Sequence, residues 1–98
     1  MKYRERLKLA ATALAREVAQ RRKKVGADPI PLAIYEARLS AVTEARRCWN
    51  RWLREHPFST REQRHIAMYE LGLPRTRREC LRQIEAIHLE VIRRLKAG

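Results

Sequence analysis

The sequence contains few of the residues on which most enzymes and metalloproteins depend. Only three glycines occur among the 98 residues, and no stretch forms a Gly-rich loop that could hold a phosphate group. The two cysteines form no Cys-x-x-Cys pair, and neither they nor the three histidines have metal-ligand spacing. No Ser/His/Asp set or pair of carboxylates stands out as catalytic. We therefore predict a protein that is not an enzyme and has no cofactor or metal ion.

Long apolar runs and acidic residues are also scarce. No run approaches the ~20 apolar residues of a membrane span, and the N-terminus is charged, unlike a signal peptide. The sequence thus predicts a cytoplasmic protein in which Cys48 and Cys80 are reduced. Against 11 Asp and Glu stand 23 Lys and Arg, which gives a formal net charge of +12. Such a charge attracts polyanions, of which nucleic acid is the most common, acidic protein surfaces the next and anionic membranes the third.

Four apolar periodicities separated by Gly and Pro predict an all-α fold of four helices in a single domain. The first helix covers residues 2–25, and the second begins at Pro31 and ends near Glu55. Each has about 24 residues and a length of ~36 Å. Equal lengths and a short connection indicate a long antiparallel helical hairpin over residues 1–57, followed by a helix-turn-helix-like pair over residues 58–98.

The hairpin is expected to pack along two apolar seams. These seams consist of Tyr3, Leu7, Ala11, Leu14, Val18 and Val25 in the first helix, and Tyr35, Leu39, Val42, Trp49 and Leu53 in the second. Trp49 and Trp52 lie about one turn apart and carry most of the aromatic area. Either both are core residues that cover the shorter helices, or one is exposed and anchors a partner.

The C-terminal half predicts a short helix over residues 60–71 and a final helix over residues 76–96. Gly72 and Pro74 separate the two. A short helix, a Gly-containing turn and a second helix with basic first turns form the layout of a helix-turn-helix, although this turn is longer than usual.

Side chains at the helix ends predict where each helix begins and ends. Ser59 with Glu62, and Thr76 with Glu79, have the spacing of a capping box. Gly26 follows the first helix as the residue expected to adopt a left-handed conformation directly after the C-cap.

The final helix is expected to pack along one apolar face. Leu81, Ile84, His88, Val91 and Leu95 recur at steps of three and four residues. His88 lies within this seam, so we predict a hydrogen-bonded core histidine rather than a metal ligand.

Residues 78–86, RECLRQIEA, resemble the sequence RERVRQIEA in the recognition helix of region 4 of bacterial primary sigma factors. The two agree at seven of nine positions without gaps and differ at the third and fourth. The resemblance implies a helix that reads promoter DNA, with Arg78, Glu79 and Gln83 facing the bases. It covers roughly a fifth of the chain, and the rest of a sigma factor is absent, so no promoter-opening factor is implied. For Glu79 it conflicts with the capping box, which ties this side chain to Thr76.

Two functions remain open. The first is a small basic DNA-binding transcriptional regulator, compact like those of phages and mobile elements, whose last helix enters the major groove of duplex DNA. Its candidate contacts are Arg75, Arg77, Arg78, Glu79, Arg82 and Gln83, with Arg61, Arg64, Arg21, Arg22, Lys23 and Lys24 on flanking phosphates. The run of residues 21–24 is alternatively a solvated helix end. The second function is a helical interaction protein that docks on an acidic protein surface. A phage-type inhibitor, a mimic of sigma region 4 that engages the transcription machinery and a ribonucleoprotein subunit belong to this class.

Overall fold

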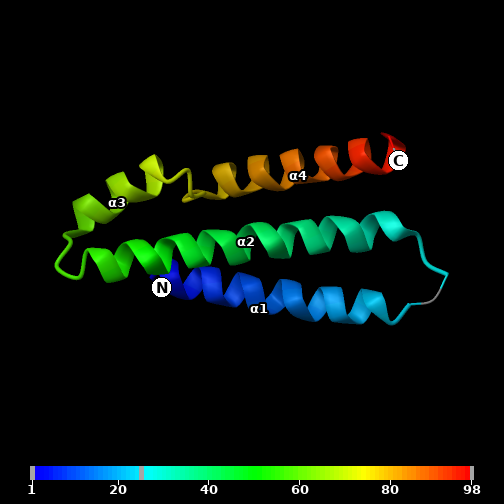
Figure 1. The fold of residues 1–98 in the computed structure, drawn as a ribbon, viewed down its shortest axis with the longest axis horizontal. Helices are drawn as coiled ribbons and strands as arrows, with labels where there is room; N and C mark the ends of the chain where they lie inside the picture. The colour runs from blue at the N-terminus through cyan, green and yellow to red at the C-terminus, as the bar shows by residue number, and fades with distance from the viewer. Residues whose placement is uncertain (1, 25, 98) are drawn as a thin grey trace.

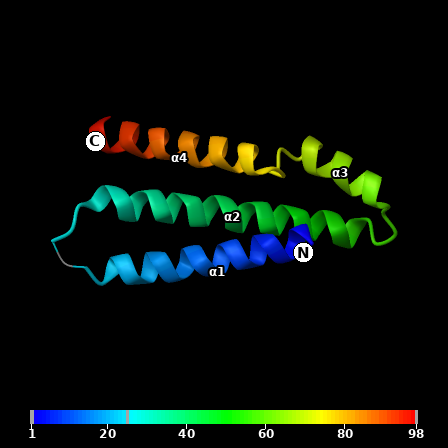
Figure 2. The same cartoon turned by 180° about the vertical axis from the view of Figure 1, so that it is seen from behind.

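A computed structural model of the chain describes residues 2–24 and 26–97. Within these residues the chain forms four α-helices and no strand, which confirms the predicted all-α fold. The helices are α1 (Tyr3–Arg22), α2 (Pro29–Glu55), α3 (Arg61–Glu70) and α4 (Arg77–Ala97). α1 and α2 form the predicted antiparallel hairpin, and α3 and α4 return one after the other along α2 (Figures 1 and 2). α2 is therefore the central helix of an elongated molecule of 51 × 25 × 21 Å.

The predicted seam of α1 is the face that packs on α2. Leu7, Leu14 and Val18 are buried along it. Val25, the last residue predicted for this seam, lies outside the described residues. The helix itself ends at Arg22, earlier than predicted. Gly26 has φ +78° but lies three residues beyond the C-cap Lys23, so the prediction that it directly follows the C-cap was wrong.

α2 begins two residues earlier than predicted. Asp28 is the N-cap, and its Oδ1 accepts a hydrogen bond from the backbone N–H of Ile30 at 3.0 Å. Pro29 and Pro31 both lie in the first turn. The first N–H groups of a helix have no intrahelical partner, so a proline there removes no hydrogen bond. For this reason Pro29 does not delay the helix to Pro31.

α3 begins with a different capping box from the predicted one. Thr60 is the N-cap, its Oγ1 accepts from the N–H of Gln63 at 3.1 Å, and Gln63 Oε1 accepts from the N–H of Thr60 at 2.8 Å. The predicted pair of Ser59 and Glu62 was therefore wrong by one residue. The spacing rule fits both pairs, because a hydroxyl residue and a Glu or Gln stand three apart in each.

The turn after α3 is a Schellman motif. The N–H of Gly72 donates to the carbonyl of Tyr69 at 3.1 Å, and the N–H of Leu73 donates to the carbonyl of Met68 at 2.9 Å. Gly72 has φ +69°, a conformation that glycine adopts without strain. Because Leu73 is buried in the same turn, the motif fixes the direction in which the chain continues toward α4.

The largest group of buried side chains lies where α1, α2 and α3 meet. It consists of Leu7, Ala45, Trp49, Ala67, Met68 and Leu73. Trp49 is 2% exposed and contacts the Tyr3 ring edge-on at 5.8 Å and the Trp52 ring face-on at 5.3 Å between centroids. Trp49 is thus the predicted core residue, whereas Trp52 is only half-buried.

The face that α4 buries overlaps only in part with the predicted one. Val91 is buried and Ile84 is half-buried, as predicted for the seam. Ile87, which was not assigned to the seam, is also half-buried. The other predicted members, Leu81, His88 and Leu95, are exposed. The core histidine and the Leu81 seam were therefore wrong. Apolar residues occupy a wide arc of α4, so the sequence contains two adjacent apolar strips. The position of α2 decides which of them is covered.

Candidate nucleic-acid interface

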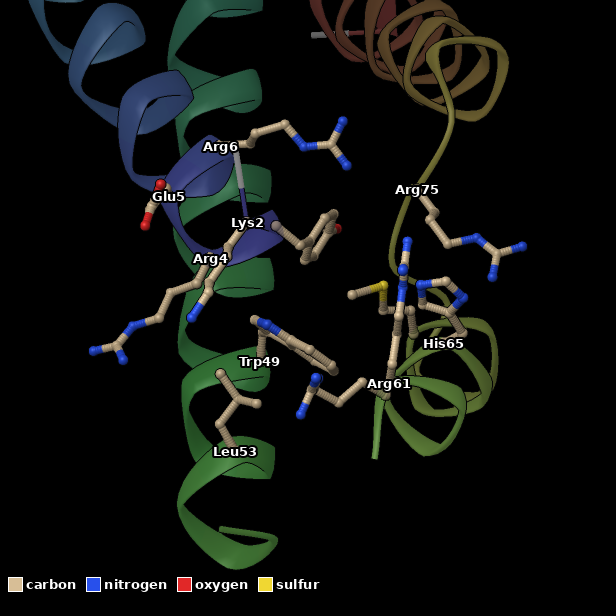
Figure 3. A pocket seen from close by; sticks show the side chains of 12 residues that line it. Lys2, Arg4, Glu5, Arg6, Trp49, Leu53, Arg61, His65 and Arg75 are labelled. Atoms are coloured by element: carbon tan, nitrogen blue, oxygen red, sulfur yellow. The ribbon is translucent and has the colours of Figure 1, made fainter. Parts of the chain in front are cut away.

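Three segments that are far apart in the sequence surround one hollow of about 710 Å³ beside the start of α1 (Figure 3). The first turn of α1, the start of α3 and the segment before α4 form its rim, and α2 contributes to its floor. Its cationic side chains are Lys2, Arg4, Arg6, Arg61, Arg64 and Arg75, with His65 beside them. Glu5 is the one carboxylate among its lining residues. We call this site the basic hollow.

A hydrogen bond across the fold holds the two sides of the basic hollow together. The hydroxyl of Tyr3 donates to the carbonyl of Pro74 at 2.7 Å, although the two residues are 71 apart in the sequence. Burial raises the pKa of Tyr3 from 10.0 to about 12, so the hydroxyl keeps its proton throughout the physiological range. The start of α1, which carries Arg6, is thereby fixed opposite the segment that carries Arg75 (Figure 3).

The cations of the basic hollow are not neutralised by neighbours. Within residues 2–24 and 26–97, no carboxylate oxygen lies within 4.0 Å of a cationic nitrogen of Lys2, Arg4, Arg6, Arg61, Arg64 or Arg75. Arg64 donates from Nη1 to the carbonyl of Ser59 at 2.7 Å, a bond that orders the side chain but leaves its charge uncompensated. Six cations against one carboxylate give the basic hollow a strong positive potential.

The floor of the basic hollow is apolar and closed. It contains Trp49, Leu53 and Met68, of which Trp49 is 2% and Met68 6% exposed. Trp49 is therefore too deeply buried to stack on a base, and the Tyr3 hydroxyl is already bonded to Pro74. The groups that the hollow presents to a ligand are five guanidinium groups and one ammonium group, which suit phosphate oxygens, and the exposed imidazole of His65.

The candidate base-reading residues of α4 lie on different sides of the helix. Arg78 and Arg82 are exposed and about one turn apart, and Arg78 follows Arg75 of the basic hollow by three residues. Gln83 is half-buried and, with Arg77, lines a groove between α1 and α4. On an α-helix, five residues separate Arg78 and Gln83 by about 140°. Arg78 and Arg82 therefore remain available to a ligand, and Gln83 is partly covered.

Glu79 caps α4. Its Oε2 accepts hydrogen bonds from the backbone N–H groups of Arg75 at 2.7 Å and Thr76 at 3.2 Å, while the N–H of Glu79 donates to Thr76 Oγ1 at 3.1 Å. This is the predicted capping box. The two accepted bonds lower the pKa of the Glu79 carboxyl below its usual range. Glu79 was predicted either to cap the helix or to face DNA bases, and in the structure its carboxylate caps the helix.

The basic run of residues 21–24 lies at the opposite end of α1 from the basic hollow (Figure 1). Arg21 Nε is 2.8 Å from Glu17 Oε1, the predicted i,i+4 pair, and its guanidinium lies 4.6 Å from the Tyr35 ring centroid. Arg22 Nη2 is 3.1 Å from Glu36 Oε2. Two of the four charges are thus paired within the protein. Lys23 and Lys24 are exposed.

Three cations of the basic hollow were not among the predicted contacts. Lys2, Arg4 and Arg6 alternate along the start of the sequence, a pattern that a solvated helix end also produces. The start of α1 meets α3 only in the folded chain, so the sequence contains no sign that these residues join Arg61 and Arg75. The structure thus brings three predicted residues, Arg61, Arg64 and Arg75, together with these three unpredicted ones.

No family model, curated protein or solved structure matches this chain. The resemblance of α4 to sigma region 4 therefore stays a prediction. In the part of the chain that the structure describes, no group of three or more His, Cys, Asp or Glu side chains could hold a metal ion. None of the described helices is long and apolar enough to cross a membrane. Cys48 and Cys80 are free thiols.

Proposed function

We propose that this protein binds duplex DNA and that the cationic side chains of the basic hollow contact the phosphate backbone. The observation that carries the proposal is that six Lys and Arg residues, from three distant segments, line one hollow that contains a single carboxylate. Nucleic-acid affinity depends mainly on such phosphate contacts, which release the counterions condensed on the duplex.

The closed floor supports a duplex rather than a single strand as ligand. Proteins that bind single strands combine a basic groove with exposed aromatic rings on which bases stack. The basic hollow offers little ring surface, because Trp49 is 2% exposed and Tyr3 is half-buried, and the imidazole of His65 is its one exposed ring. A duplex offers phosphates without exposed bases and fits this chemistry better.

The first turns of α4 extend the contact surface in this proposal. Arg78 and Arg82 are exposed and continue from Arg75, which lies on the rim of the basic hollow. Arginine is the side chain that most often contacts guanine in the major groove. These two residues would add sequence preference to a backbone grip, as a transcriptional regulator requires. The two helices of a helix-turn-helix cross each other, whereas α3 and α4 run in the same direction along α2 (Figures 1 and 2). The proposal therefore rests on phosphate contacts of the basic hollow rather than on a helix-turn-helix.

A charge-matched pair of variants tests the proposal. Lys2, Arg4 and Arg61 are replaced together by Gln in one variant, and Arg16, Lys23 and Lys24 in the other. Each variant loses three exposed cations, but only the first loses them from the basic hollow. Anisotropy of a labelled random-sequence duplex, titrated at several salt concentrations, gives the affinity and its salt slope.

We expect the hollow variant to lose affinity for all duplex sequences and its salt slope to fall by roughly 0.9 for each phosphate contact removed. The matched variant should change little. Equal losses in the two variants, or binding of single strands as tight as binding of duplex, would contradict the proposal.

A further inference from the structure

We infer that the apolar groove between α1 and α4 is a docking site for an acidic amphipathic helix of another protein. This groove adjoins the basic hollow: Tyr3, Arg6 and Arg75 line both, and the other lining residues of the two differ. Its volume is about 660 Å³. We call it the α1–α4 groove.

Each of three helices forms one surface of the α1–α4 groove. α1 contributes Ala10 and Ala13, α2 contributes Tyr35 and Val42, and α4 contributes Cys80, Ile84 and Ile87. The alanines and Cys80 are exposed, and the larger apolar side chains are half-buried. The groove is thus an accessible apolar surface that this chain does not cover itself.

The shape of the α1–α4 groove fits a helix. α1 and α4 both pack on α2, and the groove that all three helices line is where a fourth helix would complete a bundle. The small side chains of Ala10 and Ala13 allow another helix to approach closely. The groove follows α1 from Tyr3 to Glu17, a length of about 21 Å at 1.5 Å per residue. This is enough for roughly four turns of helix, the usual geometry of a helix that binds in a groove.

The charges around the α1–α4 groove select an acidic occupant. Its rim carries Arg6, Arg38, Arg75 and Arg77. The one carboxylate among its lining residues is Glu17, which is already bound by Arg21 at 2.8 Å. A helix with apolar residues on one face and Glu or Asp along its edges would bury the apolar floor and meet the arginines at the rim.

Charge also argues against other occupants. A second copy of the chain would bring together two bodies with a formal charge of +12 each, which repel each other. Phosphates of nucleic acid would meet the arginines but leave Val42, Ile84 and Ile87 in contact with water. An acidic amphipathic helix satisfies both the apolar floor and the basic rim.

A synthetic peptide tests the inference. The probe is an acidic helical peptide with Leu at positions i, i+3, i+4 and i+7 and Glu at its edges. The control peptide has the same composition with the Leu residues redistributed around the helix. Binding is measured by peptide fluorescence anisotropy. Alkylation rates of the two thiols are followed by mass spectrometry, because Cys80 lines the groove and Cys48 does not.

We expect the amphipathic peptide to bind at least tenfold more tightly than the control peptide. At saturation it should slow alkylation of Cys80 severalfold and leave that of Cys48 unchanged. The Ala13→Gln variant places a polar side chain in the groove and should weaken peptide binding about tenfold, whereas Ala19→Gln, exposed on the same helix outside the groove, should not. Arg38→Gln with Arg77→Gln should weaken it similarly, compared with Arg54→Gln as control.

Several results would overturn the inference. One is equal binding of the two peptides, because that indicates attraction by charge alone. Another is loss of peptide binding in the Lys2, Arg4 and Arg61 variant but not in Ala13→Gln, because the peptide would then occupy the basic hollow. A third is a dimer in solution that Ala13→Gln dissociates, which would make a second copy the occupant. Arg38 and Arg77 lie outside the basic hollow. A failure of the peptide experiment would therefore not contradict the proposed duplex binding, which the variants of the basic hollow test.

Discussion

The two ends of α1 are both rich in Lys and Arg but differ in the position of the carboxylates. At the first end, Lys2, Arg4 and Arg6 line a hollow with the single carboxylate of Glu5. At the other end, Arg21 and Arg22 are held by Glu17 and Glu36. The two stretches have similar basic content in the sequence. The two ends therefore differ in the number of cations without a carboxylate partner rather than in the number of cations, and the proposed polyanion site lies at the end with more unpaired cations.

The two ends also differ in what lies beneath the charges. Under the basic hollow lies the cluster around Trp49, Met68 and Leu73, to which three elements contribute. At the other end, Val18 and Val91 are the buried apolar residues of α1 and α4. The end with uncompensated charge is thus also the end with the larger core, which can hold cations from separate helices in fixed positions.

The largest expected effect follows from this difference in the core. Trp49→Ala removes the most buried ring of the cluster and should lower the free energy of unfolding by about 3–5 kcal/mol. Val18→Ala, at the other end, should cost less because fewer buried atoms are lost. Urea denaturation followed by circular dichroism gives both values. Equal losses in the free energy of unfolding would show that the buried residues at the two ends contribute similarly to stability.

A second prediction separates base contacts from backbone contacts. Arg78→Ala should cost ~1–3 kcal/mol on a preferred duplex sequence and flatten the preference at that position. Gln83→Ala should change the preference less, because Gln83 lies half-buried in the α1–α4 groove. Selection from a randomised duplex pool, followed by affinity measurements on the best and an average sequence, checks both. A larger effect at Gln83 would favour the sigma-like arrangement of the helix.

The Tyr3 hydrogen bond predicts a dependence of stability on pH. The pKa of Tyr3 is about 12 in the folded chain, above its ordinary value of 10.0. The raised value means that folding favours the protonated phenol, so this contribution is complete below pH 10 and is lost as the pH rises toward 12. Tyr3→Phe should lower stability by ~1 kcal/mol at neutral pH and reduce the loss between pH 10 and 12. Thermal melts across this range test it, and an unchanged alkaline loss in Tyr3→Phe would contradict it.

The smallest expected effect is a gain. Glu17→Gln with Glu36→Gln removes the partners of Arg21 and Arg22 and converts the paired end of α1 into an uncompensated one. The salt slope of duplex binding should rise by roughly one for each cation that then reaches a phosphate. Ser40→Gln, an exposed position on α2 without a charge, serves as control. No gain would indicate that free cations need the arrangement of the basic hollow as well as the absence of carboxylates.

Local features of this fold could be predicted from the sequence because they depend on residues within a few positions of each other. The four helices, the cap formed by Thr76 and Glu79, and the pair of Glu17 and Arg21 belong to this class. Even here, two candidate caps one residue apart at Ser59 and Thr60 could not be separated by spacing alone.

Features that depend on distant segments could not be predicted. The covered face of α4 depends on the position of α2, so Leu81 was assigned to the wrong environment. The basic hollow forms only where the start of α1 lies beside α3. The residues around Arg4 and those around Arg61 do not indicate that these two side chains line the same site. Sequence periodicity describes which faces are apolar or charged, and the tertiary fold decides which of these faces meet.

The bond between Tyr3 and Pro74 has a consequence for how the chain acquires its site. Contacts within helices connect nearby residues, and hairpin contacts such as that between Tyr3 and Trp49 close a shorter separation than this bond, which joins residues 71 apart. A fragment that ends after α2 therefore lacks the basic hollow. The arrangement that distinguishes this site is complete only when the start of α1 has met both α3 and the segment before α4.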